Sequence, residues 1–260
     1  MGTPPPLTAR SGRVRAARKL GRRSVRAEQR LFLAEGPQAV REALAVPGVV
    51  REVFATPGSH DELRTPDVHW HLVDEQALAS LADTVQPQGI VAVCGFLDVV
   101  RAELPPAKLL AVCADVRDPG NAGTVIRCAD AAGAGGVILT GNSVDPYNGK
   151  AVRASAGSLF HLPIVVEHDA SATVRALRAD GYTVLAADGA GETDLDDAAD
   201  SGLLAKRTAW LFGNEAWGLP RELTELADYR VRIPIHGQAE SLNLATAAAV
   251  CLYASARAQR

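Results

Sequence analysis

The sequence lacks a long apolar segment. No run approaches the roughly 20 apolar residues that a membrane-spanning helix needs. The basic N-terminus has no apolar core behind it, as a secretory signal would have. The composition, 47% hydrophobic and 22% charged, is ordinary for a soluble globular protein. We therefore expect a cytoplasmic protein that does not engage a membrane.

Cysteine and aromatic residues are also scarce. The four thiols lie at Cys94, Cys113, Cys128 and Cys251, and no two of them form a Cys-x-x-Cys pair. Three of them sit inside apolar stretches, which indicates buried, reduced thiols rather than zinc ligands or disulfides. Aromatic residues make up 5% of the chain, so no stacking platform of the kind used by single-strand nucleic-acid binders is evident.

Two common nucleotide-binding motifs are missing. A dinucleotide-binding enzyme needs Gly-x-Gly-x-x-Gly between its first strand and helix. The corresponding loop here reads Asp-Pro-Gly-Asn-Ala-Gly over residues 118–123, and no Walker A sequence occurs. NAD enzymes and P-loop NTPases are therefore poor candidates.

The net charge of −3 hides an asymmetry along the chain. Residues 1–30 contain nine of the 27 Lys and Arg residues and one acidic residue, Glu28, so the remainder of the chain is strongly acidic. A dense basic segment joined to an acidic body favours a polyanionic partner such as nucleic acid. The alternative is a solvated helix face that only keeps the protein soluble.

The patterning divides the chain into four parts. Residues 1–30 form a basic segment, partly disordered around its prolines up to Leu7 and helical further on. Residues 31–97 alternate short strands and helices, as in a small α/β domain. Residues 98–108, with two prolines, are typical of a linker. Residues 109–260 form the second domain.

The second domain contains strands that are apolar on both faces. Such runs are typical of a mostly parallel sheet covered by helices on each side. The expected strands are 109–113, 136–139, 182–185, 208–212 and 229–235, and the expected helices are 122–132, 151–160, 172–179 and 242–258.

Polar loops follow three of these strands, at residues 115–123, 213–220 and 236–243. Ligands of open α/β sheets bind outside the carboxyl ends of the strands, so three such loops predict one common site. Their glycines let backbone groups approach a ligand closely.

These loops resemble the motifs of the SpoU (TrmH-type) RNA 2′-O-ribose methyltransferases, a family of the SPOUT superfamily. The first motif, an Asn with an Arg six residues later, is matched over residues 121–133. The second, Gly-x-Glu-x-x-Gly, is matched over 211–219. The third, Ile-Pro followed by Ser-Leu-Asn and an Ala-rich helix, is matched over 233–249. Three motifs in order, each at a strand end, are specific.

The resemblance implies the fold and the reaction. It implies an α/β protein with a small N-terminal L30e-like RNA-binding domain, matched by Phe-Leu-Ala-Glu-Gly-Pro over residues 32–37, and a C-terminal SPOUT domain with a trefoil knot. It implies transfer of the methyl group of S-adenosyl-L-methionine to a ribose 2′-hydroxyl of structured RNA, rRNA more than tRNA, without a metal ion. It also implies a homodimer formed through the knotted domain.

The resemblance assigns catalytic residues. Arg127 would activate the hydroxyl, either as a base or, because a guanidinium is a poor base, as a clamp on phosphate that stabilises the developing alkoxide. Asn121 would bind substrate or hold Arg127, with an ordinary helix N-cap as the alternative. Glu215 would orient Arg127 or Asn121. Ser241 and Asn243 would lie near the target ribose, and either could also cap the final helix.

Binding residues follow in the same way. Gly213, Ile233 and Leu242 match positions that line the adenosine pocket, with Ile235 and Thr140 as additions. Four arginines are candidates for RNA phosphate: Arg153, Arg18, Arg22 and Arg23. His236 next to the third motif is interpreted as a solvated loop histidine. Trp217 is interpreted as a residue that packs at a subunit interface, with a cover over the cofactor as the alternative.

Two other classes of function stay open at this point. The chain could be a non-catalytic RNA-binding protein that kept the fold, although intact Arg127, Glu215, Ser241 and Asn243 argue against it. It could also be an α/β enzyme that uses another nucleotide. An assay of methyl transfer to total RNA distinguishes a methyltransferase from a non-catalytic RNA-binding protein. Titration with S-adenosylmethionine and NAD distinguishes it from an enzyme that uses another nucleotide.

Overall fold

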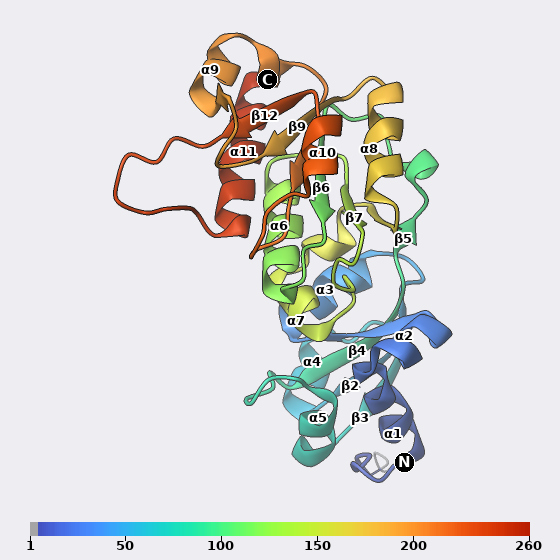
Figure 1. Cartoon of the computed structure of the whole chain (residues 1–260). Coiled ribbons are helices and arrows are strands. Elements are labelled where there is room, and N and C mark those ends of the chain that lie inside the picture. The colour runs from blue at the N-terminus through green and yellow to red at the C-terminus, as the bar shows by residue number, and fades with distance from the viewer. Residues whose placement is uncertain (1–4) are drawn as a thin grey trace. The chain divides into compact units, whose positions relative to one another are not determined.

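The computed structural model describes residues 5–260, which fall into two compact units (Figure 1). The first unit consists of the chain up to Leu97 together with Asp145–Phe160, and the second of Asp98–Val144 together with His161–Arg260. None of the helices described in residues 5–260 has the length and apolar character that a membrane-spanning helix needs. The disorder expected at residues 1–4 lies outside the described residues.

The first unit is built around a four-stranded sheet in the order β1-β4-β2-β3, in which only β2 and β3 run parallel. Its elements in chain order are α1 (Gly12–Arg18), η1 (Lys19–Gly21), α2 (Arg23–Gln29), β1 (Leu31–Glu35), α3 (Pro37–Ala45), β2 (Val50–Ala55), α4 (Pro57–Leu63), β3 (His69–Leu72), α5 (Glu75–Leu81), β4 (Ile90–Gly95), α7 (Gly149–Ala154) and η3 (Ser158–Phe160).

The basic N-terminal helices are part of this unit. Val14, Ala17 and Leu20 recur every three residues, so they share one helix face, and they pack with Leu78 in the core. Leu7, which the composition places in the disordered stretch, instead hydrogen-bonds to the backbone at the end of β3. The arginines between the apolar positions are left on the outer face.

Residues 145–160 join the first unit through aromatic and ionic contacts. The Tyr147 ring stacks on Phe96 with 3.9 Å between centroids and lies 4.8 Å from the ring of Phe32. Asp145 pairs with Arg26, which is only 4% exposed. The helix expected over residues 151–160 is interrupted, because Ala156 and the following glycine have positive φ angles of 49° and 97°.

The second unit is an eight-stranded, wholly parallel sheet in the order β10-β12-β9-β11-β6-β7-β8-β5. Its elements are β5 (Asp98–Val99), η2 (Arg101–Glu103), β6 (Leu109–Ala114), α6 (Pro119–Ala131), β7 (Val137–Thr140), β8 (Ile164–Glu167), α8 (Ala170–Ala179), β9 (Thr183–Ala187), β10 (Thr193–Asp194), α9 (Leu195–Asp200), η4 (Leu203–Ala205), β11 (Thr208–Phe212), α10 (Arg221–Leu226), β12 (Tyr229–Arg232) and α11 (Leu244–Ala258).

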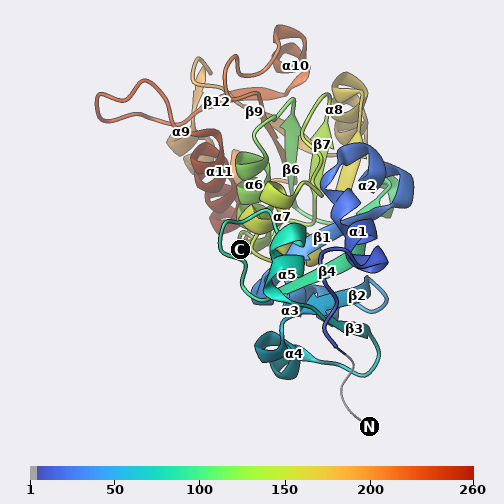
Figure 2. The same ribbon diagram turned by 90° about the horizontal axis from the view of Figure 1, so that it is seen from below.

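Helices cover both faces of this sheet. Figures 1 and 2 show α6 and α11 side by side on one face and α8 with α10 on the other. Every residue of the central strands β6, β7 and β11 is buried, as expected of parallel strands between helices. The α/β class and the parallel sheet are therefore confirmed. Residues 98–108, expected as a linker, carry β5, which pairs with β8 at the sheet edge.

Candidate active site

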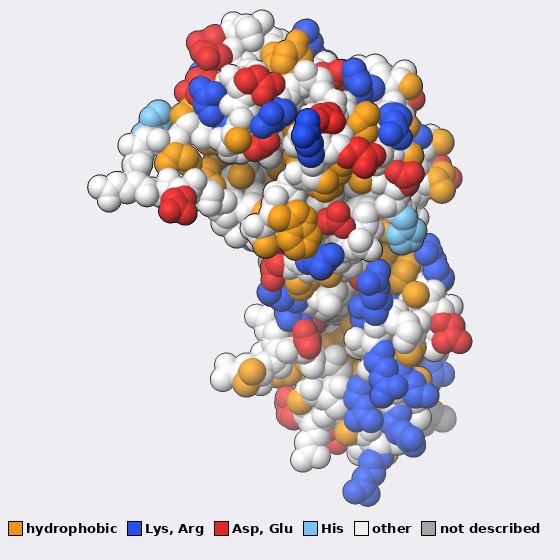
Figure 3. All heavy atoms as spheres, viewed as in Figure 1, with side chains coloured by type: hydrophobic (Ala, Val, Ile, Leu, Met, Phe, Trp, Pro, Cys, Tyr) orange, Lys and Arg blue, Asp and Glu red, His pale blue; other side chains and the backbone are white. Residues whose placement is uncertain are grey.

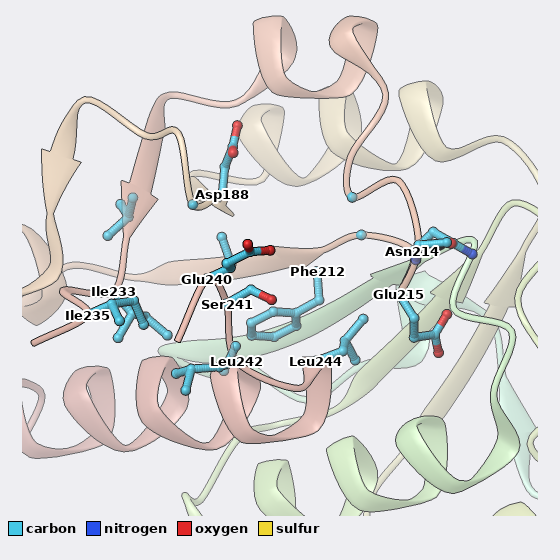
Figure 4. A pocket seen from close by; sticks show the side chains of 17 residues that line it. Asp188, Phe212, Asn214, Glu215, Ile233, Ile235, Glu240, Ser241, Leu242 and Leu244 are labelled. Carbon is cyan, nitrogen blue, oxygen red and sulfur yellow. Dashed lines mark hydrogen bonds between the residues drawn. The ribbon is translucent and has the colours of Figure 1, made fainter. Parts of the chain in front are cut away.

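A pocket of about 370 Å³ lies in the second unit, at the carboxyl ends of β9, β11 and β12 (Figure 4). One part of its wall is apolar and comes from Phe212, Ile233, Ile235, Leu242 and Leu244. Such a size and such a wall suit a small organic ligand with an apolar ring.

Polar groups line the rest of the pocket. Asp188 follows β9, Asn214 follows β11, and Glu240 and Ser241 come from the loop before α11. Asp188 also pairs with Arg230 at 3.1 Å. The pocket thus offers carboxylate and hydroxyl oxygens beside an apolar wall, as a site for a cationic ligand with hydroxyl groups would.

The loop between β11 and α10 is closed by its two motif glycines. The backbones of Asn214 and Gly218 exchange two hydrogen bonds of 2.9 Å. A Cβ on Gly213 would lie 2.3 Å from the carbonyl carbon of Gly218, so only glycine fits there. The side chain of Asn214 accepts from the amide of Ala216 and donates to the carbonyl of Asp115, which anchors the loop to the end of β6.

Glu215, in the middle of this loop, holds the N-terminus of α6. Its Oε1 accepts from the backbone of Asp118 at 3.0 Å and from Nδ2 of Asn121 at 3.1 Å, and its Oε2 accepts from the backbone of Arg117 at 3.2 Å. Asn121 in turn accepts from Nδ2 of Asn243 at 3.1 Å. One hydrogen-bonded network therefore links the three polar loops that the sequence places at strand ends.

The ionised form of Glu215 is favoured. Partial burial opposes ionisation, but hydrogen bonds from its own amide, from Asn121 and from the amides of Asp118 and Arg117 outweigh it. The pKa of Glu215 therefore lies below its ordinary value of 4.5. The carboxylate keeps its charge near neutral pH and acts as an acceptor for the network.

The caps of α6 and α11 explain why the two asparagines are held. Asp118, with Pro119 behind it, is the N-cap of α6 and accepts from the amide of Asn121. Asn121 is therefore not the cap, and its side chain is left for Glu215 and Asn243. Asn243 is itself the N-cap of α11, accepting from the amides of Ala245 and Thr246.

Arg127 is not part of this network. It is exposed on α6, and within residues 5–260 its guanidinium forms no hydrogen bond or ion pair. Of the two partners considered for Glu215, the structure selects Asn121. Ser241 is exposed and lines the pocket.

The residues assigned to the cofactor are mostly brought together. Gly213, Ile233, Ile235 and Leu242 all line the same pocket. Thr140 does not line it, because its side chain is fully buried at the end of β7. Its place in the cofactor site stays a prediction without support from its position.

The residues assigned to RNA lie in the first unit. Arg18, Arg22 and Arg23 are exposed, and Figure 3 shows Lys and Arg side chains gathered where α1 and α2 run. Arg153 is different, because it pairs with Glu35 at 3.3 Å and with Asp83 at 3.0 Å. Its guanidinium is thus already held by two carboxylates.

Sequence reasoning missed several residues of the site, among them Asn214 and Asp118 and the pocket residues Asp188 and Glu240. Asn214 anchors the loop after β11, and Asp118 caps α6. An Asp directly before a Pro is a common helix start and could have identified Asp118. No local signal identifies the contact of Asn214 with Asp115, because it joins segments about a hundred residues apart.

A parallel α/β unit with a ligand pocket and a polar network at its strand ends defines an α/β enzyme of the kind that binds a nucleotide-like cofactor. Residues 108–253 match the model of the SpoU rRNA Methylase family, and residues 12–92 match the MRM3-like substrate binding domain. The chain belongs to the SpoU rRNA methylase family.

Relatives cover nearly the whole chain. The chain is 35% identical over 253 residues to the 23S rRNA (guanosine(2553)-2′-O)-methyltransferase RlmP of Bacillus subtilis (strain 168). The match covers 95% of this chain and 96% of that protein. The structure is similar to that of the SpoU methyltransferase AviRb from Streptomyces viridochromogenes in complex with AdoMet (TM-score 0.84, 31% identity, 95% and 98% coverage).

A second solved structure agrees. An AdoMet-bound rRNA methyltransferase from Sinorhizobium meliloti matches with a TM-score of 0.81 and 32% identity, covering 95% of each chain. The predicted family and its α/β fold are thereby confirmed, as is S-adenosylmethionine as the cofactor of the class.

The pocket fits this cofactor. S-adenosylmethionine carries a flat adenine, a ribose with hydroxyl groups and a cationic sulfonium. The aliphatic side chains of Ile233 and Leu242 suit the ring, and the oxygens of Asp188, Glu240 and Ser241 suit hydroxyl groups and positive charge. A volume of about 370 Å³ is within the usual range for such ligands.

Proposed function

We propose that this protein transfers the methyl group of S-adenosylmethionine to the 2′-hydroxyl of a ribose in rRNA, and that 23S rRNA is the species. The observation that carries the proposal is the network of Glu215, Asn121 and Asn243 at the edge of a pocket that fits the cofactor. The 23S rRNA named for the relative RlmP supports rRNA over tRNA.

The residues of the chain have separate tasks. S-adenosylmethionine, when bound, supplies an activated methyl group on its sulfonium. Glu215 fixes Asn121 and the start of α6, so that the acceptor side of the site is preorganised before RNA arrives. Asn243 and Ser241 lie on the loop that enters α11, beside the pocket, where they can hydrogen-bond to the acceptor ribose.

Arg127 is assigned to the acceptor RNA. Its exposed guanidinium has no partner within residues 5–260. Because a guanidinium stays protonated at neutral pH, it is better suited to bind the phosphate beside the target ribose and to stabilise a developing alkoxide than to act as a base.

A homodimer through the second unit is part of the proposal. On α11, Val250 is 38% and Tyr253 52% exposed, and they lie on one helix face because they are three residues apart. An apolar helix face of this kind supports a second copy of the chain as the partner. We also propose that the protein acts in the cytoplasm, in keeping with its composition and with an rRNA substrate.

Methyl transfer tests the function. The purified protein is incubated with S-adenosylmethionine labelled in the methyl group and with 23S rRNA, 16S rRNA or tRNA transcribed in vitro, and 2′-O-methylated positions are mapped. We expect one methylated ribose in 23S rRNA. Absence of transfer to any of the three RNAs would contradict the proposal.

Arg127→Lys tests the catalytic assignment. We expect turnover to be nearly abolished, because a lysine cannot make the two-pronged contact of a guanidinium, while the Kd for the cofactor stays close to that of the wild type. Arg175→Lys, at an exposed position of α8, serves as the control and should keep full turnover. Wild-type turnover by Arg127→Lys would refute the role.

A further inference from the structure

Trp217 is exposed in the middle of the loop between β11 and α10. Its side chain is 55% accessible, whereas Trp210 in β11 is fully buried. An indole is among the most apolar side chains, and leaving one in water forgoes a large burial free energy. An exposed tryptophan beside Glu215 therefore indicates that the side chain binds a ligand and is not part of the hydrophobic core.

The turn that carries the ring is closed by backbone hydrogen bonds. The tryptophan follows Asn214 and Glu215 in this turn, and the two hydrogen bonds join Asn214 and Gly218. The guanidinium of Arg117 lies over the indole, 5.0 Å from the ring centroid, a favourable cation–π contact. The amide of Arg117 donates to Glu215, so the carboxylate that holds Asn121 also holds this pair.

The pair does not face the cofactor pocket. Glu215, Ala216 and Gly218 line that pocket, but Trp217 between them does not. The exposed apolar face that we assign to the second copy of the chain lies on another element, α11. Neither the lining of the cofactor pocket nor the face of α11 that we assign to the dimer includes Trp217.

A nucleobase of the acceptor RNA fits the arrangement. Arg117 is exposed and contacts the indole, which leaves more than half of the side chain open for a second flat partner. A base stacked on an aromatic side chain contributes about 1–3 kcal/mol whatever its identity. The positive charge of Arg117 attracts the adjoining phosphates of the same nucleotide strand.

We propose that Trp217, supported by Arg117, stacks on a base of the acceptor RNA next to the target ribose. The inference rests on the proposed function, since it names a contact of the same substrate. It gives Trp217 a task that differs from packing: it fixes the nucleotide against the network of Glu215, Asn121 and Asn243.

Steady-state kinetics with in vitro transcribed 23S rRNA test the contact. For Trp217→Ala we expect the KM for RNA to rise about 5- to 150-fold, which corresponds to the stacking free energy. The Kd for S-adenosylmethionine and the dimer should not change. Trp217→Phe keeps a ring and should recover most of the affinity. Val85→Ala, at a side chain that is 99% exposed in the first unit, is the control.

Fluorescence tests the same contact without turnover. In a Trp70→Phe background, Trp217 is the only exposed indole, because Trp210 is buried. Binding of the 23S rRNA transcript should quench this fluorescence and protect it from acrylamide. The experiment keeps its meaning if the wild type methylates no RNA, so failure of the proposed function is distinguished from failure of the stacking contact.

Three results would overturn the inference. The first is an unchanged KM and unprotected fluorescence in the presence of bound RNA. The second is a Trp217→Ala variant that has lost the dimer, which would make the residue an interface residue. The third is a loss of cofactor affinity alone, which would make it a cover over the cofactor.

Discussion

Hydrogen bonds between single residues join the three motifs into one site. The sequence identified Glu215, Asn121 and Asn243, but it left open whether Glu215 holds Asn121 or Arg127. The answer depends on helix phase: Arg127 lies six residues after Asn121, which turns its side chain roughly 120° away around α6. Glu215 reaches only the first of the two.

Glu215→Gln should weaken this network. An amide in place of the carboxylate presents a donor to groups that already donate, so we expect turnover to fall on the order of 100-fold through misplacement of Asn121. Glu225→Gln is the control and should keep wild-type turnover, because within residues 5–260 its carboxylate pairs with Arg221 of the same helix, α10. Equal turnover of the two variants would contradict the network.

The pH dependence of stability follows from the same group. The pKa of Glu215 in the folded protein lies below 4.5, so the carboxylate stabilises the fold above that pH, and the contribution is lost as the pH falls through the folded value. We expect the difference in free energy of unfolding between wild type and Glu215→Gln to be constant near neutral pH and to shrink below 4.5. Urea unfolding measures it; a difference that grows in acid would reverse the sign.

The thiols are also decided by their surroundings. Burial raises the pKa of Cys113 to about 12 and that of Cys94 and Cys251 above its usual range. The sequence predicted such buried thiols from their apolar neighbours, which is a local property. Cys128 is half-buried; burial raises the pKa of its thiol as well, and the charge of Arg127 beside it opposes that rise.

At the scale of elements, strands that are apolar on both faces were predictable, and a half-exposed strand was not. Strands β6 and β11 coincide with their expected runs within a residue. Strand β7, with four buried residues, was predicted, whereas β8, also with four residues, was missed because only its first two residues are buried. The break at Ala156 was missed because nothing in an alanine signals a positive φ.

Arg26 differs from the other basic residues of the N-terminal helices, because it stabilises the fold. By sequence it is one of nine similar cations, but the structure buries it in α2, where it pairs with Asp145 at 2.7 Å and donates to the carbonyls of Leu20 and Gly21. We expect Arg26→Ala to lower the free energy of unfolding by about 3–5 kcal/mol, because Asp145 loses its counter-charge.

The exposed Arg23 provides the control for this substitution. Arg23→Ala should change the free energy of unfolding by less than about 0.5 kcal/mol. Both variants are compared by urea unfolding monitored by circular dichroism. Equal stabilities would mean that the pair with Asp145 does not stabilise the first unit.

At the scale of the whole molecule, the exposed basic residues of the N-terminal segment lie in the first unit, and the candidate active site lies in the second. The sequence predicted this division from its charge asymmetry, and the exposed Arg18, Arg22 and Arg23 of the first unit support it. The triple alanine variant should bind 23S rRNA with a salt dependence reduced by about 2–3 in the slope of log K against log salt.

A matched control distinguishes this effect from loss of charge in general. Arg175→Ala with Arg221→Ala removes two exposed cations of the second unit and should leave the slope closer to that of the wild type. Filter binding at several salt concentrations gives both slopes. A triple variant with the wild-type slope would exclude phosphate contacts by these helices.

The proposed dimer makes a prediction at the same scale. Tyr253→Glu places a charge on the apolar face of α11 and should weaken self-association by at least about 30-fold, the effect of a typical interface hot spot. Val85→Glu, far more exposed in a loop of the first unit, should not. Sedimentation equilibrium distinguishes the two, and a wild type that is monomeric at all concentrations would contradict the dimer.

The trefoil knot implied by the resemblance stays a prediction.

The order of strands in the second sheet has a consequence for how the protein is made. Strand β6, at the centre, pairs with β11, which is synthesised about a hundred residues later. Asn121 likewise cannot form its hydrogen bond until Asn243, near the end of the chain, has been synthesised. A nascent chain on the ribosome can fold its first residues early, but the catalytic network closes only after the last helix has emerged. Because such distant pairings form slowly, activity should appear after release of the chain, with a measurable lag.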